Sequence, residues 1–316
     1  MTAALGDSQA DNAKRSSTEK NLDNSFIWLT RIFAIGVAGV LIWIAVQVGI
    51  QSRRAIQEFG WSFWTNSAWN PVEQQYGVLP MIYGTIVSSL IALLIAFPIG
   101  VACAIVLSEN FLPLSVRRTL IFMVELLAAI PSVVYGLWGI YVLIPFLKPI
   151  GSWLHDNFGW IPLFATPYAG PGMLPAGLIL SIMILPILTA IARDSLASLP
   201  SDLRTGSYAV GSTRWQTIFS VLIPAAFSGI VGGTMLALGR ALGETMAVTL
   251  VIGNSNELQL SVLAPANTIA SLLANQFAEA KGLQEDSLMY AGLILFAITL
   301  VVNILAEAIV QKVKKY

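Results

Sequence analysis

The sequence predicts an all-α membrane protein with six transmembrane helices, from its composition, its long apolar segments and the placement of its positive charges. Hydrophobic residues make up 56% of the chain and charged residues 11%, against roughly 25% charged residues in an ordinary soluble domain. Apolar segments of about 20 residues recur, which is the length that a helix needs to cross a bilayer. We therefore predict transmembrane helices at residues 26–50, 79–107, 119–147, 173–192, 225–252 and 286–311.

Polar segments divide the chain into regions. Residues 1–25 are polar and predict a disordered cytoplasmic tail. The apolar segment that follows is too long for a cleaved signal peptide, so we expect it to remain as the first span. Residues 26–78 contain the first span and an outer, aromatic-rich segment that we expect to anchor the chain at the membrane interface. Residues 79–311 form the helical core with a cytoplasmic loop at about 193–223, and residues 312–316 form a basic cytoplasmic tail.

The distribution of lysine and arginine orients these spans. Positive residues gather on the cytoplasmic side of membrane proteins. With both termini in the cytoplasm, the outer segments hold only Arg53, Arg54, Lys148 and Lys281. The cytoplasmic segments then hold Lys14, Arg15, Lys20, Arg31, Arg117, Arg118, Arg193, Arg204, Arg214, Lys312, Lys314 and Lys315. We therefore predict a multi-pass protein with both termini cytoplasmic.

Several function classes are disfavoured by what the sequence lacks. Cys103 is the single cysteine and His155 the single histidine, so we expect neither an internal disulfide nor a His/Cys metal site. The chain has no phosphate-loop motif for nucleotide hydrolysis. It offers no plausible nucleophile and base for an intramembrane enzyme. We expect a protein that is not an enzyme, whose surroundings are the lipid bilayer and which has no nucleic-acid partner.

Two opposite charges interrupt the apolar run at residues 236–248, where Arg240 and Glu244 are separated by four positions. An ionisable side chain at the centre of a bilayer costs roughly 2.5–3.5 kcal/mol on insertion scales. In a continuous helix, this spacing would place both side chains on one face. Intramembrane charges of this kind indicate a solute pathway, a gate or a buried ion pair. The sequence therefore favours transport.

Each of these charges has two interpretations. Arg240 can serve an anion, because a guanidinium presents a planar fork of donors that suits phosphate oxygens, or it can form a structural ion pair. Glu244 can hold Arg240 in place or act in a gate, or it can pair with Arg240 structurally. Glu125 is either a water-facing helix cap or a gate partner. We expect an Arg240–Glu244 pair to form easily within one helix, whereas Arg240 and Glu125 lie at different depths.

The loop between the fourth and fifth spans has a pattern of its own. Its residues predict a short helix, a stop at Gly211, an amphipathic helix and a proline, Pro224, at the start of the next span. The loop resembles the cytoplasmic "EAA" loop of ABC-importer permeases, in which Glu-Ala-Ala is followed by a glycine and later by Leu-Pro or Ile-Pro. Gly211 and Pro224 match that pattern, whereas Thr205, Gly206 and Ser207 replace Glu-Ala-Ala. In that family the loop is seated in the ATPase subunit.

Three further segments sharpen the resemblance. Residues 76–85, 125–139 and 236–254 are similar to segments of the permease subunits of phosphate ABC importers, and the similarity covers roughly residues 60–302. The resemblance implies a type I ABC-importer permease architecture in a bacterial inner membrane. It also implies a second permease subunit, a cytoplasmic ATPase dimer that binds ATP and Mg²⁺, and an outer phosphate-binding protein. No cofactor is then expected on this chain.

Two alternatives remain open from the residues. The same machine could carry another oxyanion, such as sulfate or molybdate. A secondary transporter that works without ATP could use Arg240 and Glu244 as its own relay. Such transporters often contain inverted repeats, but the charged motif has no second copy in this sequence.

Overall fold

The computed structural model describes residues 17–313, and the chain divides into two compact units, Met1–Ile50 and Gln51–Tyr316. The described part of the first unit is helix α2 (Ser17–Gln51). Residues 17–25 are therefore helical where the sequence predicted a disordered tail, because no glycine or proline separates them from the apolar segment. Residues 1–16 of that predicted tail, and residues 314–316 of the predicted basic tail, lie outside the described residues.

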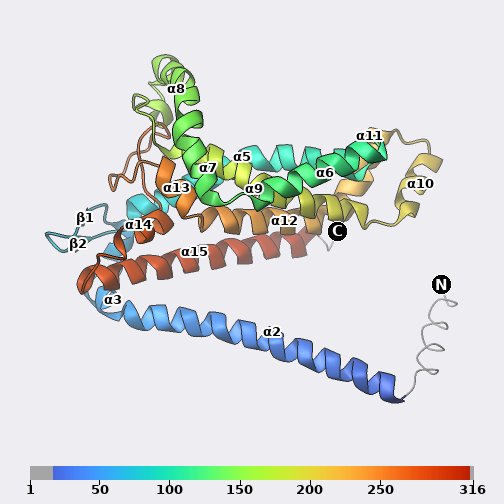
Figure 1. The fold of residues 1–316 in the computed structure, drawn as a ribbon, viewed down its shortest axis with the longest axis horizontal. Coiled ribbons are helices and arrows are strands. Elements are labelled where there is room, and N and C mark those ends of the chain that lie inside the picture. The colour runs from blue at the N-terminus through green and yellow to red at the C-terminus, as the bar shows by residue number, and fades with distance from the viewer. Residues whose placement is uncertain (1–16, 314–316) are drawn as a thin grey trace. The chain divides into compact units, whose positions relative to one another are not determined.

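The second unit is built of helices and one two-stranded antiparallel sheet, in which Trp69 pairs with Tyr76 (Figure 1). Its elements in chain order are α3 (Arg53–Phe59), α4 (Ser62–Thr65), β1 (Trp69–Asn70), β2 (Gln75–Tyr76), α5 (Leu79–Ser108), α6 (Leu114–Ala129), α7 (Ser132–Trp138), a π-helical turn (Gly139–Leu143), α8 (Ile144–Phe158), a 3₁₀ turn (Pro162–Phe164), α9 (Met173–Ala197), α10 (Ser201–Ala209), α11 (Arg214–Thr217), a second π-helical turn (Ile218–Leu222), α12 (Ile223–Leu242), α13 (Met246–Val251), α14 (Ile269–Gln276) and α15 (Leu283–Val313).

Within the described residues, six helical segments are long and apolar enough to cross a membrane, which confirms the predicted all-α class and number of spans. Four of them agree with the predicted segments to within a few residues. They are Asn21–Gln51, Leu79–Ser108, Met173–Ala197 and Leu283–Lys312.

The third predicted span, residues 119–147, is wrong in position. The chain breaks at Pro131, and the apolar segment of sufficient length is Ser132–Phe158. Ile130, the residue before the proline, has an extended backbone, because the proline ring disfavours the helical conformation in its predecessor. Helix α6 is therefore a separate element of 16 residues, about 24 Å long at 1.5 Å per residue and too short to cross a bilayer.

The fifth predicted span, residues 225–252, is wrong at both ends. The observed segment is Arg214–Leu242. The chain leaves the helical conformation around Gly243 and starts the short helix α13 at Met246. The segment that was expected to be one helix is therefore two.

Helix α9 forms the centre of the second unit. It packs against α5 and α12, and α12 packs against α15 (Figure 1). The side chains of Ile184 and Leu188 on α9 are fully buried among these neighbours. At Gly177 a side chain would collide with Ile91 of α5, so this glycine allows the two helices to approach closely.

Most rings of the aromatic-rich segment after the first span pack into a cluster within the protein, whereas the sequence predicted an anchor at the membrane interface. Phe63 is fully buried and stacks on Tyr290 of α15, with the ring centroids 4.5 Å apart. Trp64 donates a hydrogen bond from Nε1 to the Tyr290 hydroxyl at 3.0 Å. Trp69 is also buried, whereas Trp61 is 84% exposed. Stacking and hydrogen bonding together explain why most of these rings turn inward.

We predict that Phe63→Ala lowers the unfolding free energy by about 3–5 kcal/mol, because the change leaves a cavity in a packed aromatic cluster. Trp61→Ala is the matched control, and its effect should stay within about 0.5 kcal/mol because its ring is exposed. Thermal unfolding of the purified protein in detergent measures both. Equal losses in the two variants would contradict the packing of Phe63 described above.

Candidate functional site

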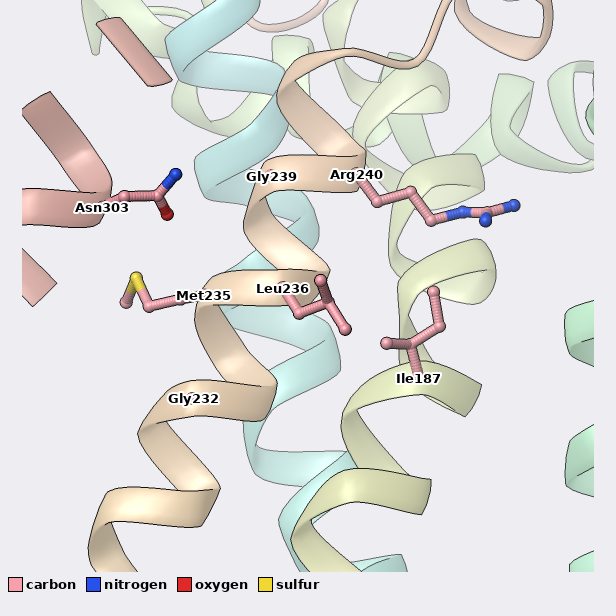
Figure 2. A pocket seen from close by; sticks show the side chains of 7 residues that line it. All are labelled: Ile187, Gly232, Met235, Leu236, Gly239, Arg240 and Asn303. Atoms are coloured by element: carbon pink, nitrogen blue, oxygen red, sulfur yellow. The ribbon is translucent and has the colours of Figure 1, made fainter. Parts of the chain in front are cut away.

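Arg240 lies in the last turn of α12 and lines a cavity of about 570 Å³ between α9, α12 and α15. Figure 2 shows its side chain on the α9 side of α12, together with that of Ile187, whereas Met235 and Asn303 lie on the opposite side. A cation in the last turn of a helix interacts favourably with the negative end of the helix dipole. The remaining lining residues are Gly232, Leu236 and Gly239.

The predicted Arg240–Glu244 ion pair does not form. Helix α12 ends at Leu242, so the four-residue spacing no longer places the two side chains on one helical face. Glu244 instead accepts a hydrogen bond through Oε1 from the backbone N–H of Ala247 at 3.2 Å, in the first turn of α13. Within residues 17–313 no carboxylate lies at ion-pair distance from Arg240.

Arg240 is exposed and lies just before the helix break at Gly243. A second break, at Pro131, precedes α7, and α7 packs against α13, the helix that follows the break at Gly243. The Tyr135 hydroxyl on α7 donates a hydrogen bond to the backbone carbonyl of Leu127 near the end of α6, at 2.8 Å. The helices that follow the two breaks are therefore in contact, and the donors of the exposed guanidinium are available to an anion.

Glu125 belongs to a different cluster. Its Oε1 lies 3.9 Å from Nη1 of Arg193 on α9, and its side chain is 58% exposed. Arg193 makes a closer contact with Asp194, through Nη2 and Oδ1 at 2.8 Å. An exposed ion pair of this kind contributes little to stability. As expected, Glu125 does not pair with Arg240.

The connection between α9 and α12, residues 198–222, has the predicted short helix and glycine stop, but the helix that follows continues without a break into the fifth membrane segment, Arg214–Leu242. Helix α10 is followed by Gly211 at φ +83°, a conformation that glycine adopts without strain. Thr213 and Gln216 form a capping box at the start of α11. Pro224 lies in the first turn of α12, directly after a π-helical turn.

The three residues that depart from the Glu-Ala-Ala pattern face different surroundings. Thr205 and Gly206 are exposed on α10. Ser207 turns toward the chain, and its Oγ lies 2.9 Å from Oγ1 of Thr217 on α11. The surface that α10 offers to a partner is therefore made of small, uncharged side chains at these positions.

Sequence reasoning missed a buried ion pair between Glu109, which follows α5, and Arg204 on α10. Nη2 of Arg204 lies 2.8 Å from Oε1 of Glu109, and the Glu109 side chain is only 7% exposed. A signal existed, since Glu109 is the single acidic residue between the predicted second span, residues 79–107, and the predicted third span, residues 119–147. An acidic residue placed directly after an apolar span needs a partner or water.

The family whose description is "Binding-protein-dependent transport system inner membrane component" matches residues 96–315. The chain belongs to this family, and it is a multi-pass inner membrane permease.

Relatives within the family narrow the comparison. The phosphate transport system permease protein PstC of Mesorhizobium japonicum is 46% identical over 297 residues, which cover 92% of this chain and 90% of that protein. PstC of Pasteurella multocida is 43% identical over 291 residues, covering 90% of this chain and 91% of that protein. The probable PstC of Methanocaldococcus jannaschii is 40% identical over 259 residues, covering 79% and 82%.

Solved structures confirm the fold of an ABC-importer permease. An inward-facing MetNI methionine ABC transporter has a TM-score of 0.52 at 18% identity, covering 75% of this chain and 94% of that chain. A bacterial ABC transporter involved in the import of the acidic polysaccharide alginate has a TM-score of 0.53 at 17% identity, covering 94% and 99%.

We predict that Arg240→Ala leaves the thermal unfolding of the protein within about 0.5 kcal/mol of wild type, because an exposed side chain without an ion pair stabilises little. Glu244→Ala should cost about 1 kcal/mol, the usual cost of losing a side-chain cap. Unfolding in detergent compares the two variants. A large loss of unfolding free energy in Arg240→Ala would indicate instead that Arg240 forms a structural ion pair.

Proposed function

We propose that this chain is a permease subunit of an ATP-driven importer that moves inorganic phosphate across the bacterial inner membrane, with both termini cytoplasmic. The carrying observation is an exposed guanidinium, that of Arg240, which lines a cavity and has no carboxylate partner within the described residues. The relatives named as phosphate transport permeases support the choice of anion. The placement of lysine and arginine supports the orientation.

The proposed machine contains four kinds of protein. A second permease completes the pathway, a dimer of cytoplasmic ATPases binds ATP and Mg²⁺, and an outer binding protein delivers phosphate. ATP binding closes the ATPase dimer and displaces α10, which has no buried residue and exposes Thr205 and Gly206 for docking. The helices then switch between inward-facing and outward-facing arrangements as rigid bodies.

The Arg240 guanidinium offers phosphate a fork of charge-assisted hydrogen bonds. Because Arg240 is exposed at the end of a helix, water competes for its donors and the anion is held weakly. Weak binding suits transport, since a tightly held ion would not leave the pathway. Glu244 supports this arrangement by capping α13, which fixes the point at which the chain turns away from α12.

We predict that Arg240→Ala reduces ATP-dependent phosphate uptake by about tenfold or more, the effect of losing one charge-assisted interaction of about 1.5–3 kcal/mol. Arg240→Lys should retain an intermediate rate, because it keeps the charge and loses the fork. Uptake of radiolabelled phosphate into proteoliposomes that contain the complete complex measures these rates.

Arg53→Ala is the control for the uptake measurement, since Arg53 is an exposed arginine at the start of α3, away from the cavity. Excess sulfate, added as a competitor, tests the anion. Competition by sulfate would assign the machine to a broader oxyanion class. Uptake that needs no ATP would contradict the importer and favour a secondary transporter.

We predict that Gly211→Ala lowers the amount of phosphate moved per ATP hydrolysed. A side chain at φ +83° strains the turn between α10 and α11 by about 1–2 kcal/mol. Gly282→Ala is the matched control, because Gly282 also has a positive φ, +59°, with open space around it, and it lies before α15. An equal loss in both variants, or in neither, would contradict a specific role of the α10–α11 turn in coupling.

A further inference from the structure

The turn between α5 and α6, residues 109–113, is held by the ion pair between Glu109 and Arg204, whose side chains are only 7% and 21% exposed. Arg204 on α10 donates two hydrogen bonds to Oε1 of Glu109, from Nε at 3.1 Å and from Nη2 at 2.8 Å. Its remaining donors bind the backbone carbonyls of Leu196 at 2.9 Å and Leu199 at 3.2 Å, at the end of α9. One guanidinium thus joins α10, the end of α9 and the end of α5.

A second contact fixes the same turn to α11. The guanidinium carbon of Arg214 lies 3.6 Å from the centre of the Phe111 ring, and the Trp215 ring lies 5.5 Å from it. Such cation–π contacts add attraction beyond packing. Two helices of the α9–α12 connection therefore contact the α5–α6 turn: α10 contacts Glu109, and α11 contacts Phe111.

Helix α6 leads from this turn to the break at Pro131. It packs against α9, but none of its side chains is fully buried, so α6 can move as a unit without opening a buried core. At its far end, the carbonyl of Leu127 accepts the hydrogen bond from Tyr135 on α7. On α7, Gly136 lies against Ala247 and Leu250 of α13. Glu244 caps that same helix through the Ala247 N–H, so contacts connect the turn to the chain break between α12 and α13, just after Arg240.

We propose that the Glu109–Arg204 pair is the joint that transmits movement of α10 to α6, and through α6 and α7 to the chain break beside Arg240. This inference rests on the proposed function, because the movement of α10 that it follows would be started by ATP binding to the ATPase dimer. Glu109 and Arg204 are positioning residues in this account, since neither meets the anion. A buried ion pair suits a joint because its geometry is specific and removal of one partner leaves an uncompensated charge.

The test uses the complete complex of both permeases, the ATPase dimer and the binding protein in proteoliposomes. Phosphate uptake and ATP hydrolysis are measured in the same vesicles, and their ratio is the readout. We expect Glu109→Gln to keep most of the ATP hydrolysis and to lower the ratio by roughly tenfold, because Arg204 loses its charged partner. Arg54→Gln is the control, since it breaks another arginine–carboxylate pair, Arg54–Asp286, in which the arginine is 76% exposed and which joins α3 to α15 away from α10.

Phe111→Leu is the second variant, and it decides the question if Glu109→Gln does not assemble. It removes the aromatic contact with Arg214 and leaves no buried charge, so the complex should assemble while the ratio falls several-fold. A wild-type ratio in Phe111→Leu would overturn the proposal, as would a parallel loss of uptake and hydrolysis in the assembled Glu109→Gln complex. If the wild-type complex hydrolyses ATP without moving phosphate, the proposed function fails. If the wild-type complex moves phosphate and both variants keep its ratio of uptake to hydrolysis, only the role of the Glu109–Arg204 pair is refuted.

Discussion

Because α12 ends at Leu242 and α13 begins at Met246, Arg240 and Glu244 belong to two helices instead of one. The carboxylate of Glu244 is engaged by a backbone N–H of α13, and it is not available to neutralise the guanidinium. The cation is left exposed at the negative end of the α12 dipole. The electrostatics of the cavity follow from this one interruption of the helix.

The break also explains how a membrane segment can contain an arginine. A cation at the bilayer centre is costly, whereas one near the end of a span can reach water and polar groups. Placement in the last turn of the Arg214–Leu242 segment therefore lowers the cost that a central position would carry. The same placement exposes the guanidinium to a solute that enters the cavity. The position of Arg240 at the end of the span therefore both lowers the cost of its charge and makes that charge accessible.

Two contact systems hold the ends of the helical core in different ways. At the α3 end, aromatic rings stack and exchange hydrogen bonds around Phe63 and Tyr290, which favours a rigid structure. At the α10 end, the contacts are a buried ion pair and a cation–π contact on the short turn between α5 and α6. Specific polar contacts can keep their partners together while the helices that carry them move. In the mechanism that we propose, the α10 end therefore holds the moving parts and the α3 end the fixed frame.

The sequence predicted the fold class, the number of spans and the short helix and glycine stop of the α9–α12 connection, because apolar length and Gly211 are local signals. It misplaced the third span because apolar composition continues through Pro131, and only the backbone of Ile130 reveals the break. The Arg240–Glu244 pair was wrong for the same reason, since it assumed a continuous helix. The sequence signals that Glu109 needs a partner, but Arg204 lies 95 positions away, and no local pattern identifies it as that partner.

Charge rescue at position 240 tests the central claim most directly. An Arg240→Cys variant, made with Cys103→Ser because Cys103 is the one native cysteine, can be modified with aminoethyl methanethiosulfonate or with a neutral reagent of similar length. If a free positive charge at this position serves the anion, the cationic reagent restores part of the ATP-dependent phosphate uptake and the neutral reagent does not. Equal rescue by both reagents, or full uptake before modification, would contradict the account.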